Sequence, residues 1–362
     1  MDADTSEEPA VLPRPNLAAV AALAGVSAST ASLAFSGAGP VSEATKAKVL
    51  AAAEALHYGG PDPRAQSLRR GRSGIIGVVI EDSLRDAFRD PMNLAMLDGL
   101  ADALGPLGSS LLLLNGTQTE PGVVPAALGS APVDAVVLVG CSTRLTESVT
   151  VFRQRGVPLV AIEAEPMEGV VAVDIDNREA SRFLAAHLRS LGHTHVAIIT
   201  LPLSPTEIRG TLTSDREARS EGYTATARIA GVREVYPDAA GEVSAGSYIE
   251  EGERAARALL SSPNRPTAII AQSDLLAVGV IRAAEELGLT VPDDLSVVGF
   301  DGVPLHGLTT HDLTTMVQPA IEKGRATGRG VLALLAGEEA DATLFSCEFH
   351  AGATTAPPRS RG

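Results

Sequence analysis

The sequence predicts two kinds of unit: an N-terminal all-α helix-turn-helix domain, and a larger α/β body built from two doubly wound parallel sheets. A length of 362 residues is more than one compact domain usually needs. Near Gly74 the pattern changes from helical spacing to short, continuous apolar runs. The composition, 45% hydrophobic and 20% charged, is typical of a folded chain and excludes a disordered one.

Charge is distributed unevenly along the chain. The formal net charge of −15 disfavours nucleic acid as a partner, because phosphate binding needs clustered Lys and Arg. The segment from Arg14 to Arg72 nevertheless holds seven basic residues against three acidic ones, a net charge of +4. We therefore expect a small N-terminal unit that meets a polyanion and an acidic body that does not.

Residues 1–13 are expected to form a disordered leader, because they are acidic and rich in proline and lack the apolar region of a signal peptide. No apolar run in the chain approaches the roughly 18 residues that a membrane span requires. Cys141 and Cys347 are most simply small apolar residues in a reducing compartment. We expect a cytoplasmic protein with no membrane partner, cofactor or metal.

The N-terminal domain, residues 14–58, reads as three short helices. Cap residues and glycines place them at 17–24, at 28 to about 36 and at 43 to about 57, with N-caps at Asn16, Ser27 and Ser42. Two short helices joined by a three-residue turn that contains Gly25 match the helix-turn-helix pattern.

The second helix of such a motif enters the major groove of DNA. Hydroxyl groups suited to phosphates or base edges lie at Ser27, Ser29, Thr30 and Ser32, and Ala28 and Leu33 are expected on the groove-facing side. A purely structural helical hairpin is the alternative interpretation, since Ala-rich helices are common. Residues 59–73 form a linker in which residues 64–70 are expected to add a further short helix.

The body, residues 74–362, alternates apolar runs with helical patterns. The expected strands are 75–80, 111–114, 135–139, 159–162, 170–175, 196–200, 268–271 and 295–300. Helical patterns separate several of them, at 93–104, 178–191, 252–260 and 275–287. This alternation predicts parallel sheets covered on both faces, and the length suits two sheets better than one.

Ligands of such sheets bind beyond the carboxyl ends of the strands. Asp176, Ser273, Asp274 and Asp301 lie just after apolar runs and are therefore candidate ligand residues. For each of them a helix N-cap or a loop turn is the alternative interpretation. The sequence contains no Gly-x-Ser-x-Gly elbow, Walker loop or metal-spaced Cys/His pair, so we do not expect an enzyme.

Several segments carry a family resemblance in order along nearly the whole chain. They are residues 20–36, 41–49, 53–58, 65–73, 76–79, 191–193, 291–301, 313–315 and 355–358. Together they resemble the LacI/GalR (lactose-repressor) family of bacterial transcription regulators. The resemblance implies a periplasmic-binding-protein-like sensor body and a homodimeric regulator, a repressor or occasionally an activator. Such a regulator binds double-stranded operator DNA under the control of a small effector.

The resemblance also assigns roles to individual residues. Residues 64–70 become the hinge helix, in which Leu68 is a wedge between base steps and Arg64, Arg69 and Arg70 contact phosphates. A flexible basic linker is the alternative there. In the body, Arg219 matches the effector-clamping arginine and Asp215 lies four residues before it, while Ser247 or Tyr248 is expected in the same cleft. Several carboxylates with one arginine suit a sugar or a nucleoside, because carboxylates accept hydrogen bonds from vicinal diols.

The expected first lobe comprises residues 74–188 and 318–346, and the second comprises 189–317 and 347–362. Leu33 stands where the family often has Arg, and Ala28 and Ser29 open the recognition helix, so direct base readout is expected to be weak or differently directed. Two other functions stay open at this point. One is a solute-binding protein of a transport system, and the other is a sensor that has lost DNA binding.

Overall fold

The structure is a computed structural model that describes residues 15–37, 39–61, 71–81, 84–116, 125–140, 145–204 and 209–359. It divides into two compact units, Met1–Ser73 and Gly74–Gly362, which are described separately below. The expected leader and residues 62–70, which include the expected hinge helix, lie outside the described residues.

The N-terminal unit contains the three helices that the sequence predicts. They are α1 (Leu17–Ala24), α2 (Ala28–Ser36) and α3 (Glu43–Ala55). Asn16, Ser27 and Ser42 cap them, and Gly25 ends α1 in the left-handed conformation that glycine adopts without strain. Helices α1 and α2 are bent by 102° relative to each other, which confirms the helix-turn-helix.

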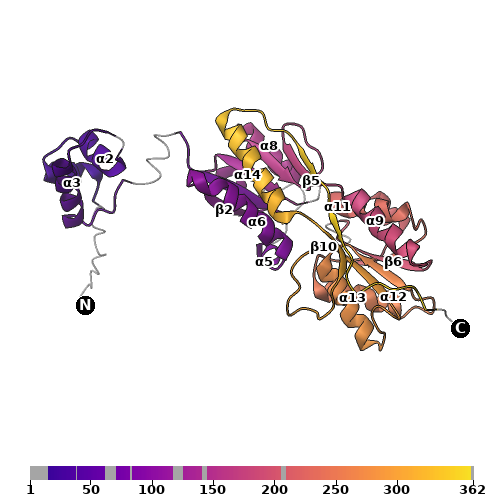
Figure 1. The fold of residues 1–362 in the computed structure, drawn as a ribbon. Coiled ribbons are helices and arrows are strands. Elements are labelled where there is room, and N and C mark those ends of the chain that lie inside the picture. The colour runs from indigo at the N-terminus through magenta and orange to yellow at the C-terminus, as the bar shows by residue number, and fades with distance from the viewer. Residues whose placement is uncertain are drawn as a thin grey trace, which may run out of the picture. The chain divides into compact units, whose positions relative to one another are not determined.

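The first lobe of the larger unit is a six-stranded parallel sheet in the order β12-β5-β4-β3-β1-β2. Helices α6 and α14 cover one face, and α7 and α8 cover the other, because alternate residues of each strand point to opposite faces (Figure 1). The strands are β1 (Ile75–Ile80), β2 (Ser110–Asn115), β3 (Ala135–Val139), β4 (Leu159–Ile162), β5 (Val171–Ile175) and β12 (Thr343–Phe345). The helices are α5 (Leu84–Ala87), α6 (Pro91–Leu104), η1 (Gly105–Leu107), α7 (Ala126–Ser130), α8 (Leu145–Gln154) and α14 (Ala320–Ala336).

The second lobe is a seven-stranded sheet in the order β13-β11-β10-β9-β6-β8-β7, parallel except at its two edge strands. Helices α12 and α13 pack on one face, and α9 and α11 pack on the other. The strands are β6 (Val196–Thr200), β7 (Gly210–Thr211), β8 (Ala240–Val243), β9 (Ala268–Ala271), β10 (Ser296–Asp301), β11 (Thr314–Val317) and β13 (Glu348–His350). The helices are α9 (Asn177–Ser190), α10 (Ser214–Ala218), α11 (Tyr223–Arg233), α12 (Ile249–Leu260) and α13 (Asp274–Glu286).

The chain passes between the lobes after β5, after β11 and after β12. The sequence predicts the first passage near residue 188, and this boundary needs correction. Helix α9 belongs to the second lobe, because Leu184 and Leu188 of its apolar stripe are buried in one cluster with Ile198 and Ile270 of the second sheet. The first passage therefore lies at Asp176, where β5 ends and α9 begins.

No described helix is by itself long and apolar enough to cross a membrane, although α1 and α2 together meet the length and composition requirements as a bent pair.

Helices α6 and α14 approach each other so closely that their backbones touch. A Cβ atom at Gly324 would lie 2.1 Å from the carbonyl oxygen of Met96, and one at Gly99 would lie 2.0 Å from that of Ile321. Because backbone atoms on both sides cannot move aside cheaply, only glycine fits at these two positions. This contact fixes α14 against α6 on the first lobe.

Replacing Gly324 by Ala should therefore lower the free energy of unfolding by about 2 kcal/mol, the cost of overpacking a tight contact. Gly330 provides a control in the same helix, because a Cβ there would lie an ordinary 3.6 Å from Val160. Gly330→Ala should raise the stability by up to about 1 kcal/mol through its higher helix propensity. Urea denaturation measures both variants, and effects of the same sign would contradict the close approach.

Candidate functional site: the recognition helix and the cavity between the lobes

The N-terminal end of α2 presents small side chains to solvent. Ser27, Ala28 and Ser29 are exposed, Thr30 and Ser32 are half-buried, and the side chain of Leu33 is 37% exposed. The hydroxyl of Ser27 caps the helix by accepting a hydrogen bond from the backbone N–H of Thr30 at 3.1 Å. Its Oγ also lies 2.9 Å from Oγ1 of Thr30, so these two hydroxyls stabilise the helix start.

The opposite face of α2 holds the helix in place. Ala31 and Ala34 are buried against Val20 and Val49, in the small core that the three helices share. Two aromatic rings, those of Phe35 and Tyr58, pack edge to face at 5.7 Å between centroids. The exposed face of α2 is thus presented on a packed support. The other predicted DNA contacts, Arg64, Leu68, Arg69 and Arg70, lie outside the described residues.

A cavity of about 320 Å³ lies between the two lobes of the larger unit. Its wall includes Glu81, Asp90 and Glu163 from the first lobe and Thr224, Ser273 and Asp301 from the second. Glu81 and Glu163 directly follow β1 and β4, and Asp301 ends β10, so the cavity lies at the carboxyl ends of strands in both sheets. This is where open α/β sheets bind ligands.

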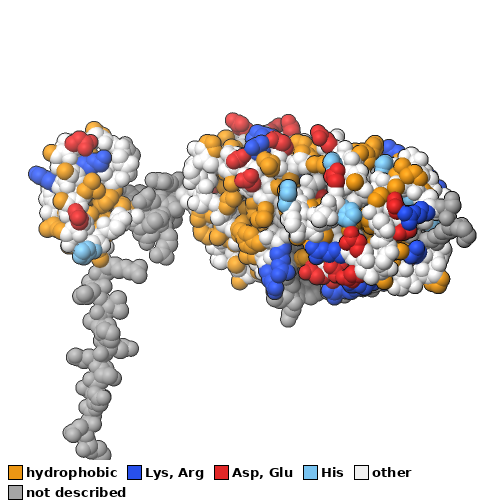
Figure 2. All heavy atoms as spheres, turned by 60° about the horizontal axis from the view of Figure 1, so that its bottom comes forward, with side chains coloured by type: hydrophobic (Ala, Val, Ile, Leu, Met, Phe, Trp, Pro, Cys, Tyr) orange, Lys and Arg blue, Asp and Glu red, His pale blue; other side chains and the backbone are white. Residues whose placement is uncertain are grey.

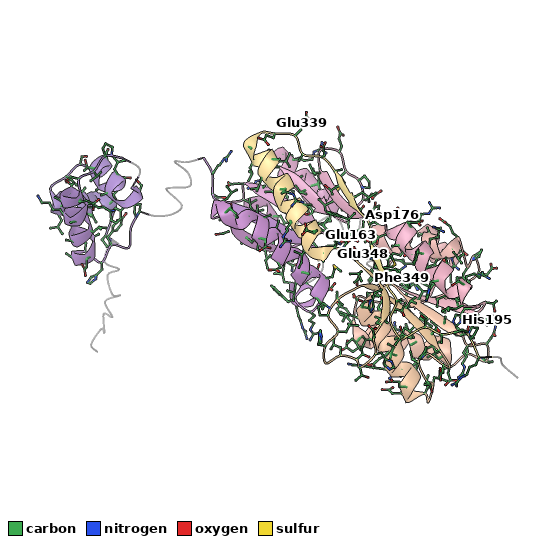
Figure 3. All side chains as sticks on the ribbon, in the orientation of Figure 1. Glu163, Asp176, His195, Glu339, Glu348 and Phe349 are labelled. Carbon is green, nitrogen blue, oxygen red and sulfur yellow. The ribbon has the colours of Figure 1, made fainter. Side chains whose placement is uncertain are left out.

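Two carboxylate residues of the wall have strained backbones. Glu163 has φ 50° and Asp301 has φ 121°, and both angles fall in the region that favours glycine. Such strain persists only where the surrounding structure compensates for it, and it is concentrated at functional sites. With these backbone angles, both residues line the cavity between the lobes, and Figure 3 shows Glu163 at the junction of the lobes.

These two carboxylates and four other buried or half-buried side chains are linked by hydrogen bonds and ion pairs into a closed ring. We call this set the interlobe ring. Its members are Glu163, Asn177, Arg228, Asp301, Gln318 and Lys323. Glu163 and Lys323 belong to the first lobe, Asn177, Arg228 and Asp301 belong to the second, and Gln318 lies on the passage into α14. The ring therefore joins the two lobes at the floor of the cavity.

Arg228, from α11, is the cation at the centre of the ring, and its side chain is 3% exposed. Its Nε donates to Oδ1 of Asn177 at 2.7 Å, and one Nη donates to the carbonyl oxygen of Gln272. The guanidinium lies 3.6 Å from Asp301 and 3.7 Å from Glu163. It also stacks over the ring of Phe300 at 3.7 Å, so its charge and its plane are both held by the protein.

The two carboxylates respond differently to burial. Burial alone would raise the pKa of Glu163, but the charges of Lys323 and Arg228 outweigh it and hold that pKa below its ordinary value. Burial raises the pKa of Asp301 well above its ordinary value. Arg228 opposes that rise, and the negative charges of Asp274 and Asp90 add to it. The cavity wall therefore contains one carboxyl group whose pKa is lowered beside one whose pKa is raised.

The structure brings only some of the predicted effector residues to the cavity. Ser273 and Asp301 line it, and so do Ser247 and Tyr248. Asp274 is buried behind Asp301, where it accepts hydrogen bonds from Thr315 and from the backbone of Val303, and burial raises its pKa to about 7.

Three other predicted effector residues do not line the cavity. Asp176 is exposed and caps α9 by accepting from the backbone N–H of Glu179 at 2.9 Å. Asp215 and Arg219 are also exposed, and Nε of Arg219 donates to the carbonyl oxygen of Asp215. Arg219 follows the short helix α10 directly and folds back on it, so the arginine of the cavity wall is Arg228 instead.

Sequence reasoning missed Arg228, although a signal was present. Helix α11 buries Ala225, Ile229 and Val232 at helical spacing, and Arg228 falls on the same buried face. A charged residue at a position where the helical period requires an apolar one indicates a buried ion pair or a ligand site. Glu163 directly follows the apolar run 159–162, so the strand-end rule that selected Asp301 could have found it. Gln318 and Lys323 carried no comparable signal, because segments distant in sequence bring them to the site. No cluster of metal-ligating side chains occurs among the described residues.

Thr224 also lines the cavity, and it lacks a hydrogen-bond partner. It is 3% exposed, and its Oγ1 is one of two buried side-chain polar atoms without a partner in the described part of the chain. A buried hydroxyl without a partner costs about 1–3 kcal/mol, so this hydroxyl lowers the stability of the ligand-free protein.

Thr224→Val should raise the free energy of unfolding of the effector-free protein by about 1 kcal/mol, because it removes an unsatisfied buried hydroxyl. Thr327→Val is the matched control. The hydroxyl of Thr327 is fully buried and donates to the carbonyl oxygen of Lys323 at 2.8 Å, so its loss should lower stability by about 1 kcal/mol. Thermal unfolding without ligand distinguishes the two, and destabilisation by both would show that Thr224 has a partner.

Comparisons with known proteins agree with this architecture. Residues 16–60 match the family described as bacterial regulatory proteins, lacI family, and residues 185–355 match the periplasmic binding protein-like domain. Among solved structures, the lac repressor dimer bound to operator and the anti-inducer ONPF shares the fold. Its TM-score is 0.77 at 22% identity, and the match covers 95% of this chain and 100% of that one.

Two characterised relatives span most of the chain. The HTH-type transcriptional regulator IpsA of Corynebacterium glutamicum is 30% identical over 351 residues, which cover 94% of this chain and 97% of the relative. The ribose operon repressor of Escherichia coli is 34% identical over 308 residues, covering 84% and 88%. With its helix-turn-helix and its two-lobed sensor unit, this chain belongs to the lacI family of bacterial transcriptional regulators.

Proposed function

We propose that this protein is a homodimeric transcriptional repressor whose affinity for operator DNA is set by a small effector bound between the lobes. One observation carries the proposal: a single chain joins a helix-turn-helix to a two-lobed unit whose cavity contains two strained carboxylates at strand ends. Such a cavity suits reversible binding, so we propose a sensor and not an enzyme. Because its partner is DNA, we place the protein in the cytoplasm.

A hydroxyl-rich molecule suits the cavity wall. The carboxylates of Glu163 and Asp301 accept hydrogen bonds, and the guanidinium of Arg228, within 4 Å of both, donates them. The hydroxyls of a vicinal diol can donate to the first and accept from the second. The E. coli relative is named as a ribose operon repressor, which is consistent with an effector of the sugar class. A molecule that contacts both lobes would favour one relative orientation of them and so change the state of the operator-binding units.

On the DNA side, the exposed residues Ala28, Ser29 and Leu33 are proposed to contact the major groove. Ala and Leu offer apolar contact, for example to a thymine methyl group, whereas Ser29 offers a hydroxyl. Arg64, Arg69 and Arg70 are proposed to bind phosphates beside the Leu68 wedge.

The first lobe also exposes several large apolar side chains that support a dimer. They are Phe88, Leu94, Leu107 and Ile321, which are between 39% and 60% exposed. Leu94 and Ile321 belong to α6 and α14, the neighbouring helices on one face of the first sheet. Figure 2 shows acidic and basic side chains interspersed over parts of the face that it presents. A dimer joined through this lobe would present two recognition helices to a near-palindromic operator.

Selection of bound genomic fragments by the purified protein, with and without a panel of sugars and nucleosides, tests the proposal. We expect enrichment of a near-palindromic sequence that is lost or gained with one compound. A complete lack of salt-dependent, sequence-selective binding would show instead a sensor that has lost DNA binding.

Asp301→Asn should weaken the response to that effector by about tenfold or more, because a charge-assisted hydrogen bond contributes about 1.5–3 kcal/mol. The fold should persist, because Asn keeps an oxygen that can accept the hydrogen bond from Nε2 of Gln318. Asp294→Asn is the control: its carboxylate accepts hydrogen bonds from the backbone N–H of Thr290 and from Arg359, and Asp294 does not line the cavity. Operator binding titrated with effector measures both, and equal responses would remove Asp301 from the site.

Leu68→Gly should weaken specific operator binding by about tenfold or more, with little change in thermal stability, because it removes only the proposed wedge. Leu287→Gly, at the exposed C-cap of α13 in the second lobe, provides the control for losing a leucine outside both the DNA-binding region and the proposed dimer surface. Gel shifts with specific and random DNA separate the effects. Unchanged specific affinity would leave residues 64–70 as a flexible basic linker.

A further inference from the structure

Gln318 lies where the chain passes from the second lobe into α14. It follows β11 directly, and α14 begins two residues later at Ala320. Gln318 is 5% exposed and lines the cavity. A long polar side chain at this point can reach partners in both lobes, so its contacts decide how the cavity is connected to α14.

The carboxamide of Gln318 joins an anion of the second lobe to a cation of the first. Its Nε2 donates to Oδ1 of Asp301 at 2.7 Å, and its Oε1 accepts from Nζ of Lys323, which ends the first turn of α14. The backbone N–H of Gln318 also donates to the carbonyl oxygen of Asp301 at 2.9 Å. Turning the carboxamide over would place its NH2 group against the ammonium and its oxygen against the carboxylate, so the two charges fix its orientation.

The first turn of α14 is held firmly against α6. The carbonyl group of Ile321 lies against Gly99, and Gly324 lies against the carbonyl group of Met96, so closely that neither glycine could carry a Cβ atom. Figure 1 shows the two helices side by side on the first lobe. Because helices in backbone contact cannot shift independently without a loss of packing, a displacement at the start of α14 is expected to move α6 with it.

The same turn also reaches the proposed dimer surface. Ile321, three residues after Gln318, is 39% exposed and belongs, with Leu94 of α6, to the apolar side chains proposed to form the dimer. Two residues further on, Lys323 is buried and paired with Glu163. The cavity and the proposed dimer surface are thus connected through a single turn of helix.

We propose that Gln318 is a positioning residue for operator binding. Its bonds to Asp301 and Lys323 tie the first turn of α14 to the second lobe, and this tie sets the orientation in which a dimer joined through α6 and α14 presents its two operator-binding units. The inference rests on the proposed function, because it names the residue that connects the effector cavity to the dimer surface. A molecule bound in the cavity lies against both Asp301 and Gln318, the two residues that form the tie.

Gln318→Met tests the tie, because Met has nearly the length of Gln and makes neither hydrogen bond. The full chain without effector is titrated onto the near-palindromic DNA fragment enriched by the selection described above, and fluorescence anisotropy measures the affinity. We expect operator binding to weaken by about tenfold or more, within the usual range of coupling between distant sites. Sedimentation velocity and thermal unfolding establish that the variant is a folded dimer.

Gln272→Met is the matched control. Gln272 is also a buried carboxamide, 2% exposed, but its side-chain bonds stay within the second lobe. Its Nε2 donates to the carbonyl oxygen of Ala225 at 3.1 Å, and its Oε1 accepts from the backbone N–H of Leu201 at 3.0 Å. The control should therefore lose stability, as Gln318→Met does, while its operator affinity stays within about twofold of that of the unmodified protein.

Exchanging the two groups of the tie provides a rescue. Gln318→Glu keeps an acceptor for Lys323 but places a carboxylate against that of Asp301, so operator binding should weaken as in Gln318→Met. Adding Asp301→Asn supplies an amide at position 301 that donates to the new carboxylate at position 318, with the net charge of the unmodified protein restored. The double variant should recover operator affinity to within about threefold of the unmodified protein.

Three results would overturn the inference while leaving the repressor function intact. They are an operator affinity of Gln318→Met that is unchanged or tighter, an equal loss of affinity in Gln272→Met, and a double variant that binds operator no better than Gln318→Glu. A lack of sequence-selective DNA binding by the unmodified protein would instead overturn the proposed function, and the inference with it.

Discussion

The interlobe ring is the constraint on which the arrangement of the larger unit depends. Fully buried Lys323 and nearly buried Arg228 carry charges that water cannot reach, and each is neutralised by a carboxylate of the cavity wall. A buried ion pair of this kind adds little net stability, but removing one partner is costly because the other charge is left unpaired. The ring therefore fixes how the ends of the two sheets meet more than it strengthens the fold.

The same ring explains why the cavity lies where it does. Glu163 and Asp301 hold unfavourable backbone angles at the ends of β4 and β10, and the ion pairs with Lys323 and Arg228 compensate for that strain. Because the ring includes residues of both lobes and of the passage into α14, a molecule that contacts its members contacts the joint itself. In the proposed function, ligand binding would be coupled to the relative orientation of the lobes through these few hydrogen bonds.

The N-terminal unit follows a different principle. Its stability rests on small apolar residues, such as Ala31 and Ala34, which let three short helices approach closely, and on hydroxyl or amide caps at each helix start. The recognition helix is left with Ala28, Ser29 and Leu33 on its exposed side. Much of the sequence selectivity is therefore expected from sequence-dependent DNA deformation rather than from many hydrogen bonds to bases, while phosphate contacts supply affinity and register.

The amino-acid sequence by itself determined the fold class, the three N-terminal helices with their caps, and most of the strands, because these follow from local spacing and from residues at helix ends. It also placed Ser273 and Asp301 at strand ends, where the cavity lies. Only the tertiary structure decided that α9 packs on the second sheet, that Arg219 lies outside the cavity wall, and that Arg228, Glu163 and Lys323 meet. The physical reason is that a buried ion pair depends on distances between segments far apart in the chain, and no local periodicity records those distances.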